Sequence, residues 1–329
     1  MSPELAAFLT SHGQVVTTAE AGALGVNREA LRSRVRDGTL TRVARGAYVH
    51  TPAMSALAHD SERHALAARA ILRSHPGAWA ASHVTAAVLW GLPVLPSALD
   101  RVHVVHARPV GSVRRHDAFT VHRCPGTAYL LERAGVPTVT PEVAVVGTAL
   151  LGPLASAVMA IDAALRGGFC TRASLQAAVD RCARVAGVGR ARRALAAADP
   201  AAESPGESWL RLILQGLGYQ VVAQHPLRDE EGLIGYVDFY LPELGVVVEF
   251  DGKVKYQGRL RGGLSPSDAV LAERARERRI RRLGYGVARV VWPELYDVAK
   301  VRREVESAAR STRRDLVARH ERAQARARA

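Results

Sequence analysis

Helical and strand-like patterns of apolar residues alternate along the chain, starting close to its amino terminus. Thr17 or Thr18 can cap a short first helix. Asn27 can cap a second helix, in which Leu31 and Val35 stand four residues apart and are expected to face a core. The pattern therefore predicts two short helices separated by a tight turn.

Two alternating runs that are typical of β-strands follow these helices. Gly38 can end the second helix, and the runs then cover residues 40–43 and 47–50, with Gly46 in the turn between them. Helix, turn, helix and hairpin in this order predict a winged helix-turn-helix domain over residues 1–52.

Helical spacing dominates the middle of the chain, so we expect a mostly helical region over residues 53–200. Two strand-like runs, residues 102–106 and 119–122, interrupt it. The segment 143–161 carries no charged residue, but a Gly-Pro pair would break a membrane-spanning helix near its middle. Two short buried helices explain this segment better, and no membrane association is expected.

The last part of the chain follows a Pro- and Ala-rich linker and has the order helix, hairpin, helix, strand. This order predicts an α/β domain over residues 201–300, followed by a basic tail over residues 301–329. The whole chain is therefore expected to be an α+β protein of several domains. The expected elements are a helix capped by Ser204, strands over residues 237–241 and 246–251 around the loop PELG, a basic helix from Pro266, and a strand over residues 287–292.

Charge adds an expected partner to this outline. The 329 residues include 45 Lys and Arg against 31 Asp and Glu, a net charge of +14. Residues 270–329 alone contain 17 basic and 8 acidic side chains. This excess favours a polyanion such as nucleic acid, although the Arg- and Ala-rich composition of a GC-rich genome would also produce it.

Arginines in the winged region give that partner a location. Arg28, Arg32 and Arg36 recur every four residues on the second helix, away from its core positions, and Arg42 and Arg45 fall on the expected wing. We interpret them as a recognition helix and wing that contact double-stranded DNA. The alternative is a solvated face of a small helical domain.

The cysteines and histidines carry less information. Cys124, Cys170 and Cys182 have no CxxC spacing, which fits a reducing cytoplasm and argues against a structural zinc site. Four histidines lie between His103 and His122, but no Cys, Asp or Glu recurs among them at ligand spacing. We therefore expect structural or exposed histidines there rather than a metal site.

The stretch VVVEFDGKVKY, residues 246–256, holds two of the three lysines of the chain. If PELG is a four-residue loop, Asp238 falls opposite Glu249 on the neighbouring strand, and Asp251 and Lys253 continue along the same face. Opposed carboxylates are unfavourable unless a positive group lies between them, and Mg²⁺ or Mn²⁺ is a natural solution. A lysine beside such a metal suits phosphodiester hydrolysis.

These residues resemble a known nuclease pattern. Glu207, Asp238 and the run EFDGK resemble the PD-(D/E)XK nuclease superfamily, and the wider stretch resembles a family related to very-short-patch-repair endonucleases. The N-terminal region resembles the winged-helix domain of AbiEi-type antitoxins from toxin–antitoxin systems. Actinobacterial proteins that join these two ends through a helical middle are similar over nearly the whole chain. The resemblance implies a restriction-endonuclease-like fold behind a DNA-binding head.

The resemblance also implies roles for single residues. Asp238, Glu249 and Asp251 would bind the metal, Glu207 would be the helix carboxylate, and Lys253 would complete the catalytic set. The motif reads either as Glu249-x-Asp251 or as Asp251-x-Lys253. Related repair enzymes often carry a histidine shortly after this point, and this chain has none there. Structural alternatives stay open, since Glu207 can complete a capping box and the strand carboxylates can pair with lysine or arginine.

Two functions follow from these patterns. The first is a Mg²⁺-dependent DNA endonuclease that is targeted by its winged helix and serves phage defence or DNA repair. The second is an antitoxin-like transcriptional regulator with a cognate toxin partner, in which the nuclease fold is catalytically silent. The sequence leaves the DNA specificity and the oligomeric state open.

Overall fold

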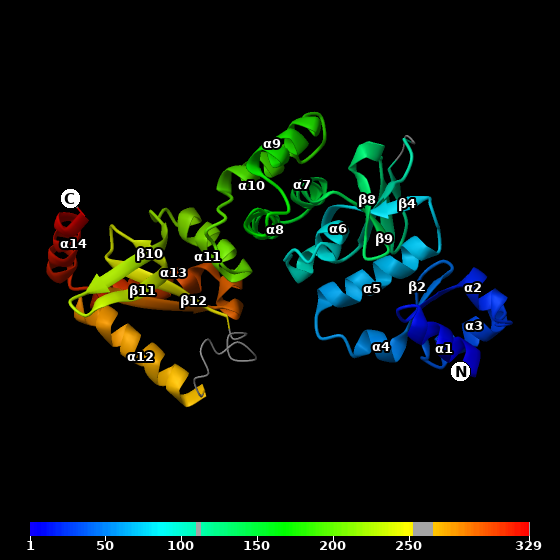
Figure 1. Ribbon diagram of the computed structural model, residues 1–329, viewed down its shortest axis with the longest axis horizontal. Helices are drawn as coiled ribbons and strands as arrows, with labels where there is room; N and C mark the ends of the chain where they lie inside the picture. Colours follow the sequence, from blue (N-terminus) through cyan, green and yellow to red (C-terminus); the bar gives the residue numbers. More distant parts are fainter. Residues whose placement is uncertain (110–112, 253–265, 329) are drawn as a thin grey trace. The chain divides into compact units, whose positions relative to one another are not determined.

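The computed structural model describes residues 1–109, 113–252 and 266–328 (Figure 1). The chain divides into two compact units, Met1–Ala198 and Asp199–Ala329. Within the described ranges, no helix is both long and apolar enough to cross a membrane.

A winged helix-turn-helix opens the first unit, as predicted. Thr17 caps α2 in a capping box with Glu20, and the Asn27 side chain accepts a hydrogen bond from the Ala30 amide at the start of α3. The strands form a sheet in the order β1-β3-β2. The elements are α1 (Pro3–Ser11), β1 (Val15–Thr17), α2 (Thr18–Ala23), α3 (Arg28–Arg36), β2 (Leu40–Ala44) and β3 (Ala47–His50).

The winged sheet shares its hydrophobic core with the region that follows it. Val15 and Val49 are buried in one cluster with Ile71 of α5 (Asp60–Arg73). The Arg73 guanidinium also forms an ion pair of 2.5 Å with Glu20 and donates a hydrogen bond to the carbonyl of His12. Residues beyond the expected boundary at 52 therefore help to hold the winged domain together.

The middle region contains more β-structure than its sequence pattern predicts. Its described residues form a mixed six-stranded sheet in the order β6-β7-β5-β4-β9-β8, in which β4–β9 and β5–β7 are parallel pairs. The two strand-like runs of the sequence are β5 and β7. The other strands have two to four residues, too short for a visible alternation. The bounds are β4 (Trp79–Ala81), β5 (Val102–His106), β6 (Arg114–Arg115), β7 (Phe119–His122), β8 (Leu130–Arg133) and β9 (Val136–Val139).

Helices surround this sheet, and the uncharged segment 143–161 lies in two of them. α7 ends at Leu151 and α8 begins at Leu154, so the Gly-Pro pair separates two buried helices, as predicted. The helices are α4 (Thr51–Ser55), α6 (His83–Leu89), α7 (Pro141–Leu151), α8 (Leu154–Arg166), α9 (Arg172–Arg181) and α10 (Val188–Ala197), with 3-10 turns at Pro96–Ala98 and Thr127–Tyr129.

The second unit is built on a sheet of order β10-β11-β12-β13. β12 pairs antiparallel with β11 and parallel with β13. The PELG loop joins β11 and β12 with Leu241 opposite Val246, the register expected from the loop length. The strands are β10 (Val222–Asp229), β11 (Gly232–Leu241), β12 (Val246–Asp251) and β13 (Gly286–Val291).

Helices cover both faces of this sheet. Phe239, Val248 and Phe250 share a core with α11 (Pro205–Gly216) and α13 (Val298–Ser311), while Tyr240 and Val247 pack with Ile280 and Val317. These last two residues lie on α12 (Pro266–Arg282) and α14 (Arg314–Arg328), and a 3-10 turn, η4 (Trp292–Tyr296), follows β13.

The expectation of a separate basic tail over residues 301–329 is wrong. Val301 and Val305 of α13 are fully buried in the core of the second unit, and Val317 of α14 is buried on the opposite face of the sheet. Because arginines fill the exposed sides of these helices, the composition of the segment hides its apolar stripe.

A glycine pair on α11 offers a matched test of this packing. A Cβ atom at Gly206 would lie 2.0 Å from the Phe250 ring, whereas at Gly216 nothing lies within 4 Å. Gly206→Ala is expected to destabilise the second unit by about 1–3 kcal/mol through overpacking. Gly216→Ala should be neutral or stabilising by up to about 1 kcal/mol. Urea unfolding of both variants checks this, and equal effects would contradict the close packing of α11 on β12.

Candidate functional site

A basic groove of about 1,480 Å³ lies within the first unit, between the winged domain and one end of the six-stranded sheet. One wall comes from α3 and the β2–β3 wing, and the other from β6, β7 and the end of α5. Asp117 is the one acidic residue among the described residues that line it. Seven arginines line the groove: Arg28, Arg32, Arg36, Arg42, Arg45, Arg114 and Arg115.

The α3 wall follows from the helical spacing of its residues. Leu31 is fully buried, so Arg28, Arg32 and Arg36 emerge on the groove side. Arg32 and Arg36 approach Glu29 at 3.6 and 3.5 Å, but their side chains remain 74% and 72% exposed. Such exposed ion pairs contribute little free energy, so these guanidinium groups can exchange Glu29 for phosphate.

The expectation that Val35 faces the core is wrong. Val35 is 36% exposed and lines the groove between the arginines. Val35 lies near the end of this nine-residue helix, where α3 no longer contacts the core. Leu31 is the one buried residue of α3. Val35 instead offers an apolar contact beside three positive charges.

The wing adds two further arginines to the same wall. The ladder between β2 and β3 is irregular between Arg42 and Ala44, and the Arg42 side chain donates to the Ala44 carbonyl at 3.3 Å. Gly46 adopts a φ of +78°, which suits a tight turn that few other residues tolerate. The turn thus presents Arg42 and Arg45 beside α3.

The second wall was not foreseen from the sequence. Arg114 and Arg115 form the short edge strand β6, and Trp79, which stacks on His75 and meets Phe119 at a tilt, lines the same groove. Its ring centroid lies 4.0 Å from that of His75 and 5.0 Å from that of Phe119. In the sequence, the second wall is represented only by an Arg-Arg pair before a strand. Its place in the groove could not be predicted, because it depends on the fold that brings this pair and α3 to the same groove.

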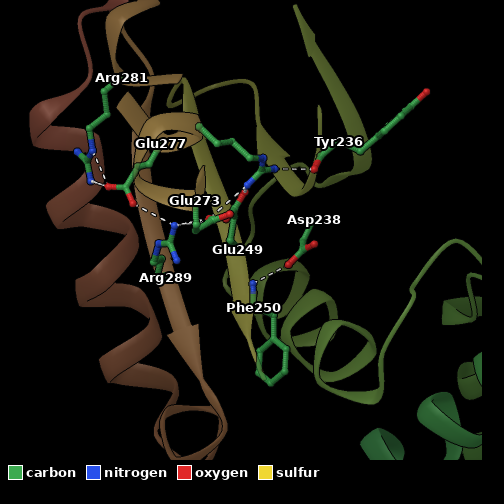
Figure 2. Close-up of polar contacts among 9 residues, drawn as sticks. Tyr236, Asp238, Glu249, Phe250, Glu273, Glu277, Arg281 and Arg289 are labelled. Atoms are coloured by element: carbon green, nitrogen blue, oxygen red, sulfur yellow. Dashed lines mark hydrogen bonds and ion pairs between the residues drawn. The ribbon is translucent and has the colours of Figure 1, made fainter. Parts of the chain in front are cut away.

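The expected carboxylate pair of the second unit lies on the face of the sheet that α12 covers. The pairs of the β11–β12 ladder run from Leu241–Val246 to Phe239–Val248, one position short of the expected Asp238–Glu249 pair. Asp238 accepts a hydrogen bond of 2.7 Å from the Phe250 amide, so one of its oxygens is bound to the neighbouring strand (Figure 2).

Glu249 forms ion pairs with two arginines. Arg276 of α12 contacts Glu249 at 2.7 Å and also donates to the Tyr236 carbonyl. Arg289 of β13 lies 3.9 Å from Glu249 and binds Glu273 at 2.6 Å (Figure 2). Burial raises the pKa of Glu249, and the Arg276 guanidinium opposes that rise. The arrangement is an ion-pair network of alternating sign.

The remaining catalytic candidates are Glu207, Asp251 and Lys253. Glu207 is buried, and its carboxylate accepts hydrogen bonds from the Ser204 hydroxyl at 2.7 Å and the Glu203 amide at 2.9 Å, a capping role at the start of α11. Asp251 ends β12 and is half-buried. Lys253 lies outside the described residues, so both readings of the motif stay open.

These side chains fit arginine partners better than a divalent cation. In the part of the chain that the structure describes, no group of three or more His, Cys, Asp or Glu side chains could hold a metal ion. The apolar residues of the helix that carries Glu207 pack on the face of the sheet opposite to the one with Arg276 and Ile280. Among the described residues, Glu249 is therefore paired with arginine, and Asp238 is bound to the Phe250 amide.

Comparison with known proteins bears on the winged domain. Residues 3–50 match the family described as "Transcriptional regulator, AbiEi antitoxin". This range runs from α1 to β3 and includes five of the seven arginines of the groove. The N-terminal domain is thus similar to that of antitoxin regulators.

Two curated relatives are uncharacterised proteins from two strains of Mycobacterium tuberculosis. Each is 30% identical to this chain over 149 residues, which covers 45% of the chain and 50% of the relative. The chain therefore spans about half the length of the curated relatives it matches.

Proposed function

We propose that this chain is a DNA-binding transcriptional regulator of the antitoxin type. The observation that carries the proposal is the convergence of arginines from α3 and the wing on one groove, within a domain that matches a transcriptional-regulator family. A cytoplasmic protein with a cognate toxin as partner belongs to the same proposal.

In this proposal, α3 reads duplex DNA through its arginine face. The nine residues of α3 make a helix of about 13 Å in length, and the major groove of B-DNA is wide enough to admit an α-helix. Arg28, Arg32 and Arg36 would reach base edges or phosphates from this helix. Arg42 and Arg45 would contact the neighbouring phosphates from the wing, which fixes the register of the helix on the duplex.

Binding to DNA around its own gene tests the proposal. We expect a footprint in the region upstream of the gene, with an affinity that falls steeply with salt because five or more arginine–phosphate contacts release counterions. Footprinting between about 50 and 200 mM salt measures both quantities. Affinity for this region no greater than for unrelated duplex of equal length would overturn the regulatory role.

For the second unit we propose a binding platform instead of an active nuclease. The support is the Arg276 guanidinium beside Glu249, in the place where a phosphodiesterase of this pattern would need a cation. The platform would contact nucleic acid or the toxin through the exposed arginines of α12, α13 and α14. The alternative is the Mg²⁺- or Mn²⁺-dependent endonuclease with Glu207, Asp238, Glu249, Asp251 and Lys253 as its site.

A cleavage assay separates the two. The purified full chain is expected to leave supercoiled plasmid and mismatched duplex intact with Mg²⁺ or Mn²⁺, because arginine holds Glu249. The Asp238→Asn and Lys253→Met variants serve as controls for a contaminating nuclease. Metal-dependent cleavage that both variants abolish would establish the endonuclease and exclude the silent platform.

A further inference from the structure

A second, smaller cavity lies in the first unit on the other face of the β5–β7 pair. It has a volume of about 430 Å³, within the range of sites for small molecules. Thr120 and His122 of β7 line this cavity, whereas Phe119 and Val121 of the same strand line the basic groove. Because side chains alternate along a strand, the two depressions lie on opposite faces of β7, and Arg115 on the edge strand β6 lines both of them.

Three histidines gather on one wall of this cavity. The Nδ1 atom of His103 lies 2.9 Å from the Nε2 atom of His122, and the ring of His83 stacks on His122 with a centroid distance of 4.0 Å. The β5–β7 register brings His103 beside Thr120, on the same face as His122. His83 comes from the start of α6, twenty residues earlier in the chain.

The surrounding residues hold this cluster in one arrangement. His83 adopts a left-handed φ of +50°, which costs about 1–3 kcal/mol for a residue other than glycine. Gly147 of α7 makes room for it, because a Cβ atom there would lie 3.0 Å from the His83 ring. The buried Thr85 hydroxyl contacts His64 at 2.8 Å and also accepts from the His103 amide. Such strain on a cavity wall is typical of a built site.

At neutral pH the three imidazoles carry no charge. Burial lowers the pKa of His103 to about 3 and that of His122 to about 4, and it lowers the pKa of His83 well below its usual value. Neutral imidazoles offer both hydrogen-bond donors and acceptors to a guest. The histidines therefore act at pH 7 as polar contacts and not as positive charges.

The formal positive charge of the cavity comes from two arginines. Arg101 and Arg115 line it, against Asp100 as the one acidic residue among its described lining residues. Within the described residues no side-chain partner of Arg115 is found, and Arg101 donates to the His116 carbonyl. His103 and His122 turn one nitrogen each toward the other, and no group of three possible metal ligands is found among the described residues. The charge balance favours an anion over a cation.

Apolar side chains also line the cavity. They include Val84, Leu151 and Pro153. Inorganic phosphate would leave these side chains uncovered, whereas a molecule with one anionic group and a flat or compact apolar body would contact both the polar and the apolar lining. We propose that the cavity binds a small organic carboxylate, with its carboxylate at Arg115 and Arg101 and its apolar body against the His83 ring and Leu151.

Benzoate and its uncharged analogue benzamide test this ligand class directly, in the absence of nucleic acid. Histidine ring resonances of the full chain are followed by NMR as each compound is titrated. We expect benzoate to shift the signals of His83, His103 and His122 with one common Kd, and the signal of His12, which is exposed just after α1, to stay unmoved. Benzamide, which has the same shape without the charge, should bind at least about tenfold more weakly.

Paired arginine variants locate the carboxylate. Arg115→Gln should weaken benzoate binding at least about fivefold, because it removes a charged hydrogen-bond donor from an exposed edge strand without touching the core. Arg108→Gln, also exposed and outside the cavity lining, should leave it unchanged. Unmoved cluster signals with benzoate, equal binding of benzamide, or equal weakening in both variants would each overturn the proposal. None of these results depends on whether the chain binds DNA.

Discussion

Replacing Arg28, Arg32 and Arg36 together by glutamine is expected to lower duplex affinity by about 100-fold or more at moderate salt. Each arginine offers a phosphate or base contact from the exposed side of α3, and one such contact is worth about 1–3 kcal/mol where it reaches a base edge. The slope of log affinity against log salt should also become shallower, by roughly one unit for each phosphate that the variant no longer neutralises.

Arg34 provides the matched control on the same helix. It pairs with Asp37 at 3.1 Å and is absent from the lining of the groove, so Arg34→Gln removes one positive charge from another side of α3, as the single variant Arg32→Gln does from the groove side. Fluorescence anisotropy with a labelled duplex should show near-normal affinity for the Arg34→Gln variant. An equal fall in affinity for Arg34→Gln and for the single variant Arg32→Gln would mean that net charge, and not the groove, drives binding.

Replacing Arg276 by methionine is expected to destabilise the second unit by about 2–4 kcal/mol at neutral pH. Methionine keeps much of the apolar bulk but leaves Glu249, whose side chain is 12% exposed, without its closest cation. Arg276 itself is 23% exposed, so water relieves part of the cost and the destabilisation should stay below that of a fully buried pair. Hydrogen exchange of the β11–β12 amides measures it in the full chain.

The pH dependence and a second substitution test the cause of this destabilisation. Burial already raises the pKa of Glu249 in the folded protein, and removing Arg276 should raise it further. The folded variant then holds its proton to higher pH than the unfolded chain does, so its deficit should grow as pH rises from about 4 to 7. Adding Glu249→Gln removes the charge and should restore most of the stability. A deficit that is independent of pH and persists in the double variant would point to packing instead.

The parts of the fold that sequence patterns predicted well are those fixed by local rules. The PELG loop has a defined length, and loop length sets hairpin register, so Leu241 opposite Val246 followed directly. Asn27 and Thr17 cap the winged-domain helices through bonds to their own neighbours. These features need only a few adjacent residues.

The rest depends on interactions between distant elements. Arg276 stands 27 residues after Glu249, and nothing in the intervening sequence shows that α12 turns this arginine toward β12. His83 likewise joins His122 only once α6 packs on the six-stranded sheet. The sequence therefore indicated which groups carry charge but not which groups neutralise one another.

The core shared by the winged sheet and α5 extends beyond the part of the chain that matches the family. The family match ends at residue 50, yet Val15, Ala47 and Val49 are buried partly by residues from α5 onward. A fragment that ends with the match would expose this apolar face to water. The first fifty residues form a unit of sequence similarity, but the core of the folded winged domain also contains residues of α5 and the six-stranded sheet. The winged domain and the cavity that we assign to a carboxylate thus lie in one compact unit, joined by a shared core.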